Sequence, residues 1–79
     1  MQIIFSRHAK RRARLYKIPE SRIRDIVRNA ELSQGRNEIT KKIAGFKYPL
    51  KIAVQVERSI ITVITNYPFK KGQKNEGIL

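Results

Sequence analysis

The chain has 79 residues, which is enough for one domain and too short for two. Hydrophobic residues make up 41% of it and charged residues 30%, a composition typical of globular and not of disordered chains. Eighteen lysine and arginine residues against six acidic ones give a net charge of +12, which favours nucleic acid as the partner. Cysteine is absent and His8 is the single histidine, so disulfides, thiolate zinc sites, cysteine nucleophiles and histidine-rich metal sites are excluded.

No apolar stretch approaches the roughly 20 residues that a membrane span requires. The first residues also lack the order of a signal peptide. We therefore expect a cytoplasmic protein. The sequence also contains no Gly-rich phosphate loop and no metal-ligand spacing, so we expect no cofactor.

The N-terminal third reads as a short strand followed by two helices. Residues 3–5 are β-branched or aromatic and predict the strand, and the hydroxyl of Ser6 is a suitable cap for a helix over residues 7–17. Pro19 ends that helix and suits the first turn of the next one, which ends near Asn29. Apolar residues then recur at helical spacing in both segments: Ala9, Ala13 and Tyr16 in the first, and Ile23, Ile26, Val27 and Ala30 in the second.

After Gly35 the pattern changes from a helical to a strand period. The predicted strands are residues 38–43, 50–56 and 60–65, with a turn over 57–59. The last of these is β-branched throughout, which is typical of a central strand. The order β-α-α-β-β-β predicts an α+β fold in which a two-helix hairpin packs on an antiparallel sheet. We expect one domain over residues 1–69 and a basic, flexible tail over residues 70–79.

The most unusual local feature is the basic run from Arg7 to Arg12, which contains no acid. Self-repulsion within it would be relieved by phosphate. His8 and Arg12 lie four residues apart, hence one helical turn apart on the same side. A histidine moves protons and an arginine holds a phosphate, which suits RNA cleavage. The structural alternative is that His8 satisfies a hydrogen bond at the start of the helix.

Further basic and aromatic side chains are candidates for RNA binding. Lysine and arginine neutralise phosphates, and tyrosine stacks on unpaired bases. Each such lysine is equally consistent with ordinary solvation, Arg58 with an exposed turn residue, and Tyr67 with the core. The RNA-binding candidates are Arg7, Arg11, Lys47, Tyr48, Lys51, Arg58, Lys70 and Lys71.

The element order, the charge and three short motifs resemble the RelE/ParE-like toxin superfamily. The motifs are His8-Ala9-x-x-Arg12, Ile18-Pro19-Glu20 and Thr65-x-Tyr67. They are similar to those of a small, uncharacterised, BrnT-like family within it, over residues 2–68. The resemblance implies the toxin of a type II toxin–antitoxin pair, an endoribonuclease that cuts messenger RNA without metal. It implies His8 as general acid or base, Arg12 as phosphate ligand and Tyr67 as a third catalytic candidate. The implied partners are RNA, free or on the ribosome, and an acidic antitoxin.

Two other functions are consistent with the same residues. Many such enzymes carry catalytic arginine and tyrosine on the sheet, where this sequence offers Tyr67 and lysines. A non-enzymatic RNA- or DNA-binding module would use the same basic surface. ParE-like relatives instead inhibit a protein target, so the fold does not decide the activity.

Overall fold

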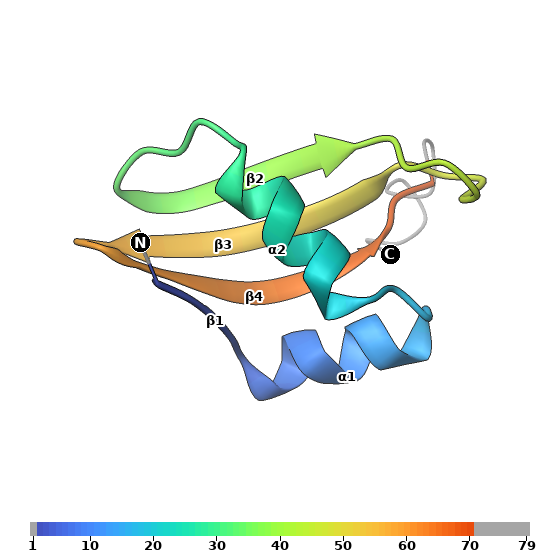
Figure 1. Ribbon diagram of the computed structural model, residues 1–79, viewed down its shortest axis with the longest axis horizontal. Helices are drawn as coiled ribbons and strands as arrows, with labels where there is room; N and C mark the ends of the chain where they lie inside the picture. The colour runs from blue at the N-terminus through green and yellow to red at the C-terminus, as the bar shows by residue number, and fades with distance from the viewer. Residues whose placement is uncertain (1, 71–79) are drawn as a thin grey trace, which may run out of the picture.

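The computed structural model describes residues 2–70, which form one helical layer and one sheet (Figure 1). The elements are β1 (Gln2–Phe5), α1 (Arg7–Leu15), α2 (Glu20–Arg28), β2 (Gly35–Lys41), β3 (Leu50–Glu57) and β4 (Ile60–Pro68). This order confirms the predicted α+β fold. Lys71 and the rest of the predicted tail, residues 71–79, lie outside the described residues.

The four strands form one sheet in the order β1-β4-β3-β2, so β4 is central, as predicted. β2, β3 and β4 are antiparallel neighbours, whereas β1 pairs with β4 in parallel. The sheet is therefore mostly antiparallel and not wholly so. The reason is connectivity: β1 leads into the helical layer and does not turn back through a hairpin, so it need not run against its neighbour.

The helices end close to their predicted positions. Ser6 caps α1 by accepting a hydrogen bond from the backbone N–H of Ala9. The helix stops at Leu15, two residues earlier than predicted, because Lys17 takes a left-handed conformation with φ of 55°. The backbone N–H of Ile18 then bonds to the carbonyl of Ala13 at 2.8 Å, which tightens the turn into Pro19, the N-cap of α2.

The strand boundaries differ more. β2 covers residues 35–41 and not 38–43, and β4 continues through Pro68. Ile43 lies beyond the end of β2, yet its side chain is buried, so burial and not strand pairing explains the apolar residue there.

The core lies between the helices and the sheet. The largest fully buried apolar side chains are Ile23 and Val27 from α2, with Leu50, Ile52, Val54 and Val63 from the sheet.

Neither helix within residues 2–70 has the length or the apolar character of a membrane-spanning segment.

Candidate nucleic-acid interface

A β-bulge in β4 decides which face of the sheet Tyr67 occupies. Val63 pairs with Val54 and Thr65 with Ala53, so Ile64 is an extra residue between two consecutive pairs. Before the bulge, odd-numbered side chains such as Val63 point into the core; after it the alternation reverses. Asn66 is consequently buried under the helical layer, and Tyr67 faces the opposite side. Helix α2 does not cover that opposite side of the sheet.

Helix α1 is tied to β4 at this bulge and beyond it. β1 ends at Phe5, opposite Val63, so the rest of β4 has α1 beside it and not a strand (Figure 1). The Ser6 hydroxyl donates to the Ile64 carbonyl at 2.9 Å. Further along, the Asn66 side-chain amide donates to the Ala9 carbonyl at 3.2 Å. These hydrogen bonds fix the position of α1 along the edge of β4.

This placement brings Arg12 over Tyr67. The Arg12 guanidinium carbon lies 5.8 Å from the centre of the Tyr67 ring, within the range of a cation–π contact. Arg12 is half-buried, whereas His8, one turn earlier on the same side of α1, is exposed. Among the described residues, the His8 side chain makes no hydrogen bond, so the structure does not support the hydrogen bond at the helix start that was considered for it.

Three more cations lie over aromatic rings next to this pair. Lys51 is the register partner of Tyr67, and its Nζ atom lies 4.7 Å from the centre of the Phe69 ring. The Phe69 backbone N–H bonds to the Pro49 carbonyl at 2.8 Å, which joins it to the segment that carries Tyr48. We call the side chains of these cation–π contacts, together with Arg12 and Tyr67, the basic–aromatic surface. It consists of Arg12, Lys47, Tyr48, Lys51, Tyr67, Phe69 and Lys70.

Two lysines of this surface contact the ring of Tyr48. The ring centre is 5.6 Å from the Nζ atom of Lys47 and 5.9 Å from that of Lys70. Lys51 also forms an ion pair of 3.2 Å with Glu38. Glu38 therefore holds the Lys51 ammonium in place while it neutralises part of the positive charge. The arrangement alternates positive charge and flat apolar rings, the two features that an unpaired nucleic acid strand requires of its binding surface.

Three of the predicted RNA-binding residues within the described part of the chain do not join this surface. Arg7 and Arg11 are exposed on the side of α1 that faces away from the sheet. Arg58 lies in the β3–β4 hairpin, at the opposite end of the sheet from Tyr67 (Figure 1). The Gln34 side chain accepts from the backbone N–H of Arg58 at 2.9 Å and donates to its carbonyl at 3.2 Å. These contacts use only the backbone of Arg58, which fits the exposed turn residue considered as the alternative. Lys71 lies outside the described residues.

Sequence reasoning missed two residues here. Phe69 lay at the end of the predicted domain, residues 1–69, and Asn66 directly after the predicted strand, residues 60–65, so neither was singled out. The sequence did contain a sign that Asn66 has a particular role, because asparagine is depleted in strands and this one directly follows a β-branched run. Its Oδ1 atom is buried without a hydrogen-bond partner among the described residues.

In the described part of the chain, no three histidine, aspartate or glutamate side chains come together as possible metal ligands. The titratable side chains of the basic–aromatic surface come instead from α1, from β3 and β4, and from the segments next to those two strands. No family model matches the chain, and searches of curated proteins and of solved structures found no match either.

Proposed function

We propose that the protein is an endoribonuclease of the toxin–antitoxin type, which binds single-stranded RNA on the basic–aromatic surface and cleaves it without metal. The observation that carries this proposal is the contact between Arg12 and Tyr67 at the edge of that surface. In this contact a guanidinium, a group suited to bind phosphate, lies beside a ring that carries a hydroxyl. His8 adds an exposed imidazole one helical turn away.

The chemistry would be an in-line transfer within the RNA strand. The ribose 2′-oxygen attacks the adjacent phosphorus, and the bond from phosphorus to the 5′-oxygen breaks. One protein group removes the 2′ proton while another gives a proton to the departing 5′-oxygen, so the products are a 2′,3′-cyclic phosphate and a 5′-hydroxyl. Arg12 would bind the non-bridging oxygens, whose negative charge grows in the transition state. His8 and Tyr67 are the two groups suited to the proton transfers.

Stacking explains why the substrate would be single-stranded. Unpaired bases present flat faces, and Tyr48, Tyr67 and Phe69 present rings to which lysines are already adjacent. A base that stacks on Tyr67 would bring its own phosphate toward Arg12. Cleavage therefore requires an unpaired strand that lies along the surface and not across it.

The test is cleavage of a labelled single-stranded RNA in EDTA, with fragment ends mapped chemically. We expect cyclic phosphate ends, and a fall in kcat/KM of about 100-fold for Arg12→Ala. Arg14→Ala is the matched control, because it removes the same side chain from an exposed position on the same helix. Its kcat/KM should stay within about threefold of the unaltered protein, since within the described residues Arg12 and not Arg14 contacts the Tyr67 ring.

Tyr67→Phe separates stacking from proton transfer, since it keeps the ring and removes only the hydroxyl. We expect unchanged binding of a non-cleavable 2′-O-methyl RNA and a fall in kcat of about 100-fold. His8→Gln should give a similar pattern. Intact RNA under all conditions, ribosomes included, would contradict the nuclease assignment.

One observation favours a second function, RNA binding without cleavage. The His8 imidazole has no hydrogen bond that orients it among the described residues, whereas a catalytic base is ordinarily held by a third group. In that case 2′-O-methyl and unmodified RNA would bind equally and both would stay intact. Arg12→Ala would then weaken the binding of both RNAs to the same extent.

A further inference from the structure

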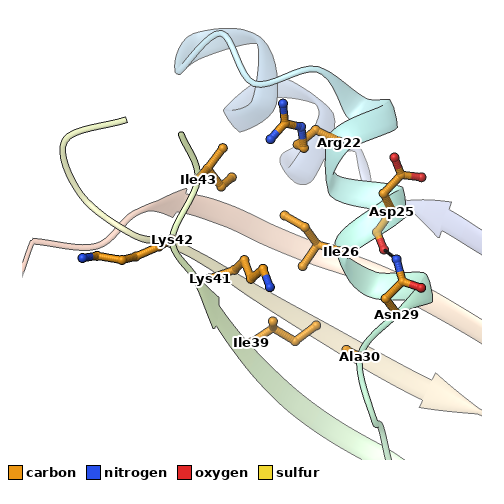
Figure 2. Close-up of a pocket in the computed structure, with 9 residues that line it drawn as sticks. All are labelled: Arg22, Asp25, Ile26, Asn29, Ala30, Ile39, Lys41, Lys42 and Ile43. Atoms are coloured by element: carbon orange, nitrogen blue, oxygen red, sulfur yellow. Dashed lines mark hydrogen bonds between the residues drawn. The ribbon is translucent and has the colours of Figure 1, made fainter. Parts of the chain in front are cut away.

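A hollow of about 380 Å³ lies between α2 and β2 and shares no lining residue with the basic–aromatic surface (Figure 2). Its floor is aliphatic: Ile26 and Ala30 come from α2 and the segment after it, and Ile39 and Ile43 from β2 and the segment after that strand. Figure 2 shows Ile26, Ile39 and Ile43 extending into the space between the two elements. We call it the α2–β2 hollow. Ile26 and Ile39 are only partly buried, which favours an occupant that covers them with apolar atoms.

The size of the hollow suits a small molecule. Small-molecule sites in proteins measure about 300–1,000 Å³ and are lined mainly by apolar side chains, with a few polar groups that orient the ligand. The α2–β2 hollow lies near the lower end of that range. Its lining contains no aromatic ring on which a base could stack, so a nucleotide suits it less well than an aliphatic chain.

The rim of the hollow is positive. Arg22 on α2 and Lys41 at the end of β2 are exposed, and neither forms an ion pair within the described residues. Figure 2 shows Lys41 extending toward α2, whereas Lys42 extends away from it. The one carboxylate of the lining, Asp25, is paired with Arg28 at 3.2 Å, so it does little to neutralise the rim. Two cations therefore border an aliphatic floor, and the complement of that arrangement is an anion at the end of an aliphatic chain.

We propose that the α2–β2 hollow binds a free aliphatic monocarboxylate, a medium-chain fatty acid. Its chain lies over Ile26 and Ile39, and its carboxylate lies at the rim beside Arg22 and Lys41. Burial of the chain supplies most of the affinity, and the charge-assisted contacts at the rim select an anion. Such a ligand would also make the stability of the fold depend on its concentration. The inference does not rest on the proposed nuclease function, because it uses none of the residues assigned to RNA.

The test adds sodium octanoate to the full chain at constant ionic strength. NMR shifts of backbone amides and isoleucine methyls give both the affinity and the position of the ligand, and thermal unfolding gives an independent measure of binding. Butanoate and hexanoate vary the chain at constant charge. Hexanol, compared with hexanoate, removes the charge at constant chain length, and octylammonium reverses it. Vesicles of an anionic phospholipid present the same combination of chain and anion as a membrane surface.

We expect octanoate to bind with a Kd of about 1 mM, a modest affinity for a ligand of this size. The shifts should centre on the methyls of Ile26 and Ile39. Each two carbons added to the chain should strengthen binding about fivefold, because the chain is partly removed from water. Hexanol should bind about fivefold more weakly than hexanoate, and octylammonium more weakly still. At ten times the Kd, octanoate should raise the Tm by about 5–10 °C.

Variants separate the rim from the floor. Arg22→Gln combined with Lys41→Gln should weaken octanoate binding about fivefold, because both cations at the rim are lost. The matched control is Lys10→Gln with Arg14→Gln, which removes the same two charges from exposed positions on α1 and should change the Kd less than about twofold. Ile39→Thr keeps a β-branched side chain in β2 but makes the floor more polar, and it should weaken octanoate about threefold.

Four results would overturn the proposal. The first is no binding of octanoate. The second is equal binding of butanoate and octanoate, or equal loss in the two doubly substituted proteins, because either would show that net charge alone attracts the anion. The third is a shift pattern centred on the basic–aromatic surface. The fourth is binding to the anionic vesicles without binding of free octanoate, which would assign the hollow to a membrane surface.

Discussion

Ser6 connects the start of α1 to the bulge in β4, and replacing it tests whether this connection holds the two elements together. The Oγ atom accepts from the Ala9 backbone N–H at 3.0 Å and its hydrogen is donated to the Ile64 carbonyl at 2.9 Å. Loss of an N-cap costs about 1 kcal/mol. Loss of the second hydrogen bond, which leaves a part-buried carbonyl without its partner, costs about 1 kcal/mol more. Ser6→Ala should therefore lower the free energy of unfolding by about 2 kcal/mol.

The assay is urea denaturation followed by circular dichroism, with thermal unfolding as a second measure. A loss of that size in a domain this small corresponds to a fall in Tm of about 8–16 °C. Ser6→Thr keeps both the acceptor and the donor, so its free energy of unfolding should stay within about 0.5 kcal/mol of the unaltered protein. Ser21→Ala is the control, because Ser21 is exposed on α2. The reasoning is refuted if Ser6→Ala and Ser21→Ala have equal effects.

The remaining predictions concern a turn, a buried amide and a ring. Arg58 has a φ of 57°, so Arg58→Gly should raise the free energy of unfolding by about 0.5–1 kcal/mol in urea denaturation. Asn66→Asp places a buried carboxylate against the Ala9 carbonyl and should lower the same quantity by about 3 kcal/mol at neutral pH; an unchanged urea midpoint would show that Asn66 is not held there. Phe69→Ala removes a stacking ring beside Lys51 and should weaken binding of 2′-O-methyl RNA at least about fivefold, measured by anisotropy, if the basic–aromatic surface binds bases.

The helical half of the fold was predictable because its signals are local. Ser6 caps the residue three positions later, and Pro19 interrupts a helical pattern at a single point. Apolar spacing then identifies the buried side of each helix, and Ala9, Ala13, Ile23 and Val27 are indeed buried. None of these inferences needs a contact between distant residues.

The candidate site was less predictable because it depends on contacts between distant segments. The run of β-branched residues before Asn66 contains no glycine or proline that would indicate a bulge, so strict alternation would have placed Tyr67 in the core. The parallel pairing of β1 with β4 and the contact between Arg12 and Tyr67 likewise join residues more than fifty positions apart. Charge counting identified Arg58 and Lys51 alike, although only Lys51 joins the basic–aromatic surface.

The side chains around each charge, and not the net charge, distinguish one basic surface from another. Within the described residues, Arg12, Lys47, Lys51 and Lys70 lie over aromatic rings, whereas Arg7 and Arg11 are exposed on α1 and make no such contact. A surface for single-stranded RNA requires rings between its charges, and of these two groups of cations only the first has them. We therefore expect RNA to contact the basic–aromatic surface, where stacking would add to the attraction that net charge supplies over the whole molecule.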